Sequence, residues 1–275
     1  MQIPSSRARP IAGILPSEFG TLADDYLVAT RAPAVLKGLV KGHESHYDPA
    51  LAKIVATAPF HHAGADETRV ALPPRAPITR PFDEVIARRA SGRAFARTPL
   101  PAAALAALLM LGNGVSHVAA AGTDHATYRR SAASAGNLAS IEIYPIILNV
   151  ADVAPGIYHF DSVGHDLARL HDGQFTEWLR ERVLHQEEFA GAAVALVLTC
   201  AFGRLRAKYG ERCLRFGFLD AGHVSENIYL AGAGLGVQVC ATAGFVDAEL
   251  DAALGLDGVD VAPVLVLLAG MPPAS

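Results

Sequence analysis

The pattern of apolar and polar positions predicts short buried strands and helices from residue 82 to the end of the printed sequence. Four apolar runs, each bounded by turn residues, are typical of buried strands. They are IEIYPIILNV (141–150), AAVALVLTCAF (192–202), VQVCATAGF (237–245) and VAPVLVLLAG (261–270). Between the first two, GIYHFDS and HDLARLHDG predict a hairpin.

Helical spacing of apolar residues predicts the elements around these strands. A longer helical stretch extends from Tyr209 to Leu235, and we expect a break near Gly217. The shorter helices lie within PFDEVIARRASGRAF (81–95), LPAAALAALLMLGNGV (100–115), FTEWLRERVLHQEEF (175–189) and VDAELDAALG (246–255).

The glycines at 232, 234 and 236 close the long helical stretch rather than opening one, and their spacing is not that of a dinucleotide-binding loop. They predict a helix cap and a tight turn into the next strand. Strands and helices alternate irregularly, and one connection is a hairpin. This order favours an α+β fold, a sheet sandwiched by helices, over a doubly wound parallel sheet.

Residues 1–81 have a different character. Prolines recur along them, the helical pattern of note is limited to Ala34–Val40, and the Pro-rich segment LPPRAPITRP ends them at Pro81. We predict a loop-rich N-terminal arm or small region with a stiff linker. The main domain is then 82–275, and residues 1–81 are a possible contact for a substrate or partner.

Composition narrows the class of protein. Of 275 residues, 51% are hydrophobic and 18% charged, which is enough for a large core. The net charge of −4 gives no positive field for nucleic acid or an anionic membrane. Three widely spaced cysteines argue against a disulfide framework and a structural zinc site. Because no signal-peptide core or membrane-length apolar run is evident, we expect a cytoplasmic protein.

Two short segments are candidates for ligand binding. Arg89, Ser91 and Arg93 place two guanidiniums around a hydroxyl near a helix end, a combination suited to a phosphate or a polar ring edge. A solvated basic turn is the alternative. Ser134, Ala135 and Gly136 precede the strand at 141–150, and small residues there let a flat ligand approach the backbone. A plain loop explains this second segment equally well.

The long helix carries a polar stripe. Asp220, His223, Glu226 and Asn227 are spaced by three and four residues on an otherwise apolar helix, so buried members need a partner in protein, water or ligand. His223 and Glu226 can in principle bind a metal, but the sequence supplies no obvious further ligands, and we predict no metal site. His43, His46, His61 and His62 lie in the loop-rich region, and we expect them to be exposed.

Lys208 and Tyr209 form a possible proton-transfer pair if desolvated. The surrounding arginines, at 204, 206, 212 and 215, would lower both pKa values through their charge. Without further information, two surface residues are the simpler interpretation.

The order of these segments resembles the SagB/McbC-type dehydrogenases of the nitroreductase superfamily. The run from YGERCLRFGFLDAGH to AGFVDAELDAALGLDG (209–258) is similar to the signature block of that group, and RASGR resembles the Arg-x-Ser-x-Arg turn of nitroreductases. PGIYHFDSVGHDLARL and SAASAGNLASIEIYP are similar to its hairpin and its strand entry. The resemblance covers about residues 82–270.

The resemblance implies a nitroreductase fold with a mostly antiparallel central sheet, a homodimer, and FMN at the interface. By the same implication Arg89, Ser91 and Arg93 hold the FMN phosphate, ribityl chain or pyrimidine edge. Ser134, Ala135 and Gly136 line the ring, contributed from the second subunit. Ala243 and Gly244 offer N–H groups near flavin N5, with Phe245 behind them, and His223 and Asn227 occupy matching helix positions.

The Lys208–Tyr209 pair is similar to the pair that marks azoline oxidases in this superfamily. It implies FMN-dependent oxidation of peptide thiazolines or oxazolines to azoles, with Tyr209 as proton acceptor and Lys208 as its pKa-lowering partner. Dioxygen would reoxidise the flavin. The group also commonly works in complexes with a cyclodehydratase.

The sequence departs from the family pattern at several positions. Glu226 stands where Gln is usual, Leu138 where Arg is common, and Ala133 where Pro is common. Met271 follows Gly270 in place of a basic residue, so part of the phosphate site is missing or supplied elsewhere.

Two other functions remain open. An NAD(P)H-dependent nitro- or quinone reductase can use the same fold, although it has no need of a Lys-Tyr pair. A member with a weakened FMN site can instead be a non-catalytic scaffolding subunit of a peptide-modifying complex.

Overall fold

The computed structural model describes residues 26, 27, 30, 68–119, 127–184, 189 and 191–274. The chain divides into two compact units, Met1–His46 and Tyr47–Ser275. In the first unit, the amide and hydroxyl of Thr30 both donate to the Tyr26 carbonyl. The predicted helix at Ala34–Val40 and the four N-terminal histidines lie outside the described residues.

The second unit is built on a seven-stranded sheet in which every neighbouring pair is antiparallel. The strand order is β1-β6-β5-β4-β7-β9-β8. The bounds are β1 (Arg69–Ala71), β4 (Ile141–Ile147), β5 (Gly156–Asp161), β6 (Asp166–Asp172), β7 (Val194–Ala201), β8 (Gln238–Thr242) and β9 (Val261–Gly270). A separate hairpin joins β2 (Val115–Ala119) to β3 (Thr127–Arg130).

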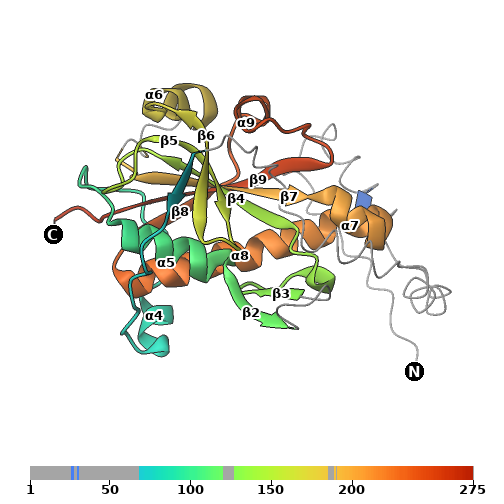
Figure 1. Cartoon of the computed structure of the whole chain (residues 1–275), viewed down its shortest axis with the longest axis horizontal. Helices are drawn as coiled ribbons and strands as arrows, with labels where there is room; N and C mark the ends of the chain where they lie inside the picture. The colour runs from blue at the N-terminus through green and yellow to red at the C-terminus, as the bar shows by residue number, and fades with distance from the viewer. Residues whose placement is uncertain are drawn as a thin grey trace, which may run out of the picture. The chain divides into compact units, whose positions relative to one another are not determined.

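Helices cover both faces of this sheet (Figure 1). One face is covered by α5 (Ala102–Asn113) and α8 (Cys213–Leu235), and the other by α6 (Thr176–Trp178), its π-helical continuation Leu179–Leu184, and α9 (Asp247–Leu254). The remaining helical elements are α4 (Phe82–Arg88), α7 (Phe202–Tyr209) and the short 3-10 turns Ala135–Asn137 and Gly210–Arg212.

The sheet divides the core into two layers because side chains alternate along each strand. On β7, Leu196 and Leu198 pack toward α5 and α8, whereas Ala195 and Val197 pack toward α9. All eight residues of β7 are buried. Each layer therefore has its own apolar cluster, and the predicted α+β sandwich is confirmed.

The predicted helix break near Gly217 is wrong. The chain breaks at Gly210, which ends α7 with a φ of 55°. Gly217 lies inside α8, and a Cβ there would be 2.6 Å from both Cys200 Sγ and Phe202 Cε1. Its lack of a side chain allows α8 to pack closely on the end of β7.

Two other features refine the sequence-based picture. The predicted cap at the glycine run is confirmed, because Gly236 ends α8 in the left-handed region with a φ of 74°. β1 pairs with β6 although it lies before the predicted boundary at residue 82, so the folded sheet includes residues as early as Arg69. None of the helices that the structure describes has an apolar run long enough to span a bilayer.

Candidate functional site

A strained turn precedes β4. Gly136, Asn137 and Ala139 have φ values of 61°, 56° and 47°, in the left-handed region that non-glycine residues seldom adopt. The Ser134 hydroxyl accepts a hydrogen bond from the Ala139 amide at 3.0 Å, closing the turn on itself. Such strain persists only where surrounding contacts impose it. We call residues 134–140 the site turn.

Lys208 and Tyr209 lie directly over this turn. A Cβ built on Gly136 would lie 2.6 Å from the Tyr209 hydroxyl and 2.8 Å from Lys208 Nζ. Lys208 Nζ also lies 5.6 Å from the centre of the Tyr209 ring. Both side chains are partly buried, and Tyr209 packs at 4.4 Å between ring centres against Phe216. Two segments about 70 residues apart in the chain thus meet at Gly136, where an added side chain would displace the ends of Lys208 and Tyr209.

The polar stripe of α8 holds the site turn from the other side. Asp220, which is 2% exposed, accepts hydrogen bonds from the Ala135 amide (3.0 Å) and the Ser140 hydroxyl (2.7 Å). Burial raises the pKa of Asp220, although both hydrogen bonds oppose that shift. His223 Nδ1 lies 3.0 Å from the Ala133 carbonyl, and Asn227 donates to the Gly112 carbonyl at 3.4 Å. Glu226 is exposed.

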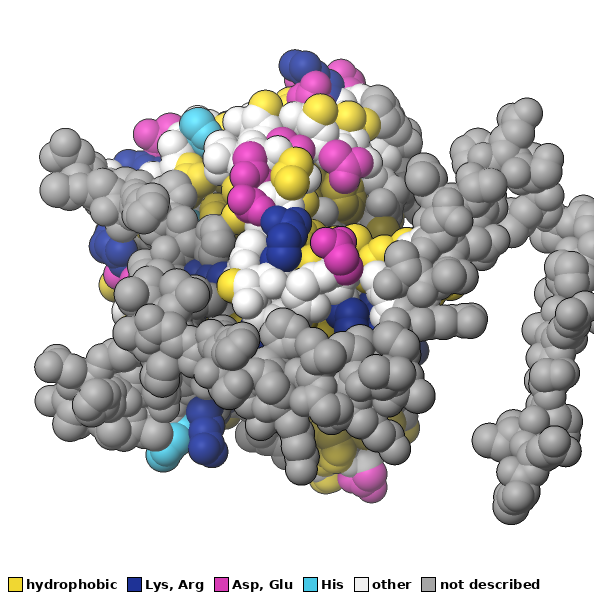
Figure 2. All heavy atoms as spheres, turned by 90° about the vertical axis from the view of Figure 1, so that its right-hand side faces the viewer, with side chains coloured by type: hydrophobic (Ala, Val, Ile, Leu, Met, Phe, Trp, Pro, Cys, Tyr) yellow, Lys and Arg dark blue, Asp and Glu magenta, His cyan; other side chains and the backbone are white. Residues whose placement is uncertain are grey.

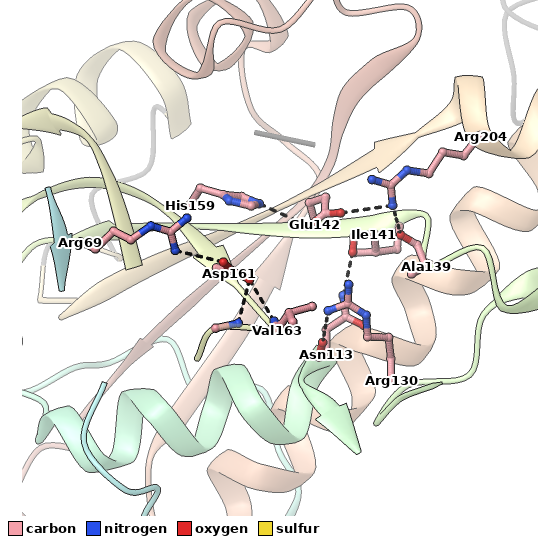
Figure 3. Close-up of polar contacts among 11 residues, drawn as sticks. Arg69, Asn113, Arg130, Ala139, Ile141, Glu142, His159, Asp161, Val163 and Arg204 are labelled. Atoms are coloured by element: carbon pink, nitrogen blue, oxygen red, sulfur yellow. Dashed lines mark hydrogen bonds and ion pairs between the residues drawn. The ribbon is translucent and has the colours of Figure 1, made fainter. Parts of the chain in front are cut away.

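A buried ionic cluster lies beneath the site turn (Figure 3). Glu142 Oε2 lies 3.3 Å from His159 Nε2, and Glu142 Oε1 forms an ion pair with Arg204 Nη1 at 3.3 Å. Arg204 Nη1 also donates a hydrogen bond to the Ala139 carbonyl at 2.8 Å. Burial alone would raise the pKa of Glu142, but the hydrogen bond from His159 and the charges of Arg204 and Arg130 together lower it. The carboxylate is therefore charged at neutral pH.

This cluster forms one wall of a cavity of about 260 Å³. Arg130 and Glu142 both line it, and among the described residues the buried Nε atom of Arg130 has no hydrogen-bond partner. The remaining lining residues are Tyr128, His159, Phe160, Asp161, Ser162 and Val163.

A second group of predicted residues gathers around Tyr229 of α8. The Ser91 hydroxyl lies 3.2 Å from the Tyr229 hydroxyl, which also accepts the Ala241 amide at 2.6 Å. The Arg89 guanidinium lies 5.6 Å from the centre of the Tyr229 ring. The backbone of Ser91 forms a parallel bridge with Val239, fixing this turn to β8. Arg93 is exposed near the same turn.

An open cavity of about 390 Å³ adjoins this second group. Arg80, Arg88 and Tyr229 line it, as does Gln238, whose Oε1 atom is buried without a hydrogen-bond partner among the described residues. Pro272, which follows the position where a basic residue was expected, also lines it. The further lining residues are Ala90, Gly92, Ala233, Gly236, Val237 and Val239.

The two groups lie a defined distance apart. Asp220 and Tyr229 are separated by nine residues of α8, roughly 13 Å at about 1.5 Å per residue. Ala243 lies one residue past the end of β8 and four residues after Val239, again roughly 13 Å at about 3.3 Å per residue. Ala243 and Gly244 are exposed, and the Gly244 amide donates to Thr242 Oγ1 at 3.1 Å.

Sheet topology explains why these segments lie at the same end of the strands. β7 and β8 both pair antiparallel with β9, so they point in the same direction, and Ile141 at the start of β4 pairs with Cys200 at the end of β7. The site turn, α7 and the residues after β8 therefore all leave the sheet on the same side.

The charge distribution and the potential metal ligands do not indicate a further site among the described residues. On the face in Figure 2, acidic side chains lie beside basic and apolar ones in its upper half, without a broad basic area among the residues that are coloured. Within the part of the chain that the structure describes, no three His, Cys, Asp or Glu side chains converge on a metal position.

The sequence patterns did not single out Tyr229 and Arg80 in the second group, or Glu142 with His159 beside the first. The last two carried a usable signal, since each is a polar residue inside an apolar strand run. Tyr229 had no comparable signal, because a tyrosine on an apolar helix is most often ordinary core.

The chain matches the model of the nitroreductase family over residues 86–271. It is 28% identical over 169 residues to a protein of Methanocaldococcus jannaschii described as a nitroreductase, covering 62% of this chain and 81% of that one.

Solved structures agree on the fold. A nitroreductase-like structure from Anabaena variabilis superposes with a TM-score of 0.62 at 19% identity, covering 76% of this chain but 42% of that longer one. The Escherichia coli microcin synthetase McbBCD complex with truncated pro-MccB17 contains a chain that superposes with a TM-score of 0.59 at 20% identity, covering 94% of this chain and all of that one. With a family match over more than half of its length and the same antiparallel sandwich, the chain is a member of the nitroreductase family of flavin oxidoreductases.

Proposed function

We propose that this protein is an FMN-dependent oxidase that converts thiazoline or oxazoline rings in peptides to azoles. The observation that carries the proposal is the placement of Lys208 and Tyr209 over Gly136. A generic flavin reductase has no use for a lysine and a phenol held together at the small-residue turn. The similarity to a chain of a complex that contains a microcin precursor peptide supports a peptide substrate.

The residues present fit FMN. Arg89, Ser91 and Arg93 offer donors for its phosphate, ribityl chain or pyrimidine edge, and Arg80 and Arg88 add cations in the adjoining cavity. These two arginines can replace the basic residue that is absent after Gly270. The unpartnered Gln238 Oε1 in that cavity is an acceptor suited to a ribityl hydroxyl.

The flavin ring of FMN would lie beyond the arginines that offer donors to its phosphate. Ser134, Ala135 and Gly136 are small enough to line it, and Ala243 and Gly244 carry exposed backbone at the required side of the sheet. His223 and Asn227 would act through the backbone, since each contacts a carbonyl oxygen beside this region.

The chemistry of the chain itself is proton transfer. Tyr209 takes the proton from the ring carbon next to the carbonyl, and Lys208 stabilises the phenolate that accepts it. The site turn orients both groups and fixes their separation. The redox chemistry would come from bound FMN, as the acceptor for the hydride of the adjacent ring carbon, with dioxygen as the final oxidant.

We also propose a homodimer and a complex with a cyclodehydratase that makes the azoline. The apolar side chains exposed on α8 support the dimer. Residues 1–81 would then contact the substrate peptide or the partner enzyme.

Replacing Tyr209 by Phe tests the proposal. Wild-type protein should lower the mass of an azoline peptide by about 2 Da per ring, because two hydrogens leave. Tyr209→Phe should abolish this change while the bound flavin spectrum stays the same. Wild-type turnover in the variant removes Tyr209 from the mechanism.

Two outcomes would favour the alternatives. Rapid flavin bleaching by NAD(P)H with no azoline oxidation would indicate a nitro- or quinone reductase. A colourless but folded dimer would indicate a scaffolding subunit.

A further inference from the structure

The buried ionic cluster near the site turn costs free energy, because its charged side chains are removed from water. The side chains of Glu142, His159 and Arg204 are 6%, 4% and 6% exposed. Desolvating two full charges offsets most of their attraction, so a buried ion pair is seldom an efficient source of stability. A well-packed apolar pair would serve the core equally well, and the cluster calls for another role.

Arg204 contacts both β4 and the site turn through its Nη1 atom. Its Nη1 lies 3.3 Å from Glu142 Oε1 and donates to the Ala139 carbonyl at 2.8 Å. Ala139 is a left-handed residue at the end of the site turn. Glu142 belongs to β4, so the sheet holds the guanidinium, and the guanidinium holds the turn to α7 (Figure 3).

The same helix touches the turn a second time. Lys208 follows Arg204 by four residues, which is one helical turn, and so lies on the same face of α7. Lys208 and Tyr209 meet the turn at Gly136, and Arg204 meets it at Ala139. Two contacts on one face set both the rotation of α7 and its position along the turn.

We propose that Glu142 and Arg204 are positioning residues that set the location of Lys208 and Tyr209 over the site turn. The inference rests on the proposed function, in which these two residues handle the proton. Glu142 and Arg204 contact neither the substrate nor the flavin in this scheme, and they act through α7.

The chain offers a readout that needs no substrate. Its lysines are Lys37, Lys41, Lys53 and Lys208, so protein labelled with ¹³C at the lysine Cε gives few signals. Lys208→Arg identifies the Lys208 signal. The chemical shift of that signal then reports the surroundings of the amine directly.

The decisive variant replaces the ion pair by apolar side chains, Glu142→Leu with Arg204→Met, because this change avoids an unpaired buried charge and should fold. Glu142→Gln is a second variant that keeps the shape of the side chain. Asn113→Ala is the matched control: it removes a buried hydrogen bond of 2.7 Å to the Ile141 carbonyl, next to Glu142, without touching Arg204.

In the double variant we expect a shifted Lys208 signal, while Asn113→Ala leaves that signal in place. Azoline turnover should fall about a hundredfold in kcat with KM within about twofold, as misplacement of a proton acceptor predicts. A folded double variant with the wild-type Lys208 signal overturns the proposal. If wild-type protein does not oxidise azolines, the proposed function falls, and the Lys208 signals still decide the positioning role.

Discussion

At the scale of single residues, the candidate site depends on backbone positions as much as on reactive side chains. Gly136 combines a left-handed φ of 61° with direct contact to Lys208 and Tyr209. Any side chain there meets both a conformational cost and a steric one. The small residues and the Lys-Tyr pair are each recognisable in the sequence, but their contact depends on tertiary structure that a local pattern does not contain.

Gly136→Ala should displace Lys208 and Tyr209 while the sheet stays intact. The added Cβ would lie within 3 Å of both side chains, and the left-handed alanine would cost about 1 kcal/mol. We expect azoline oxidation to be lost, with a small decrease in melting temperature measured by circular dichroism.

Gly255→Ala controls for the conformational cost alone. Gly255 has a similar φ of 67° at the end of α9, and a Cβ there would meet nothing within 4 Å. It should lose similar stability and keep full activity. Equal activity in the two variants would contradict a steric role for Gly136.

At the scale of elements, α9 is tied to α6 and to the π-helical segment that follows it by polar contacts that can be followed by fluorescence. Trp178, the single tryptophan of the chain, donates its indole N–H to Glu249 at 3.0 Å. Arg182 donates to the same carboxylate at 2.7 Å. The Trp178 hydrogen bond, with help from Arg182, lowers the pKa of Glu249.

The lowered pKa gives a signed pH dependence. A carboxyl with a lower pKa in the folded state contributes stability above its ordinary pKa of 4.5, and that contribution is lost as pH falls through the folded value. We expect the Trp178 emission to be constant from about pH 8 to about pH 5 and to change below pH ~4.5. In Glu249→Gln that acid step should be absent. An identical step in the variant would assign the change to another group.

Elements were also where sequence reasoning was most reliable. The buried strands and α5 follow from uninterrupted apolar runs, and the closing glycine of α8 was predicted correctly. β1 was missed because three residues carry too little pattern, and the β2–β3 hairpin because its residues are largely polar. The break at Gly210 rather than Gly217 depended on packing against Cys200 and Phe202, which a local pattern does not contain.

At the scale of the whole molecule, α8 carries apolar side chains that the described residues leave exposed. Phe218 and Leu219 are 56% and 60% exposed, and Gly222, one turn further, has open space where a side chain would be. Exposed apolar side chains beside a glycine allow a second backbone to approach closely. This face is where we expect the two subunits of the dimer to meet.

Phe218→Asp should dissociate the dimer. Each symmetric interface would lose two buried phenylalanines, each worth roughly 1.5–3 kcal/mol, and gain two desolvated charges. Sedimentation velocity at micromolar concentration should show monomers. Val163→Asp changes another exposed residue, on the β5–β6 turn, and should leave the dimer intact. A dimeric Phe218→Asp protein would place the interface elsewhere.

The sheet edges carry a consequence for handling the protein. A strand at the edge of a sheet offers unpaired backbone groups to a strand of another molecule, which promotes aggregation. β1 limits this risk by being three residues long, and β8 by the Ser91–Val239 bridge, which lays the turn around Ser91 against it. Gly92 lets that turn lie flat, since a Cβ there would overlap Gln238. Substituting Gly92 should therefore cause precipitation during purification as well as a paler protein.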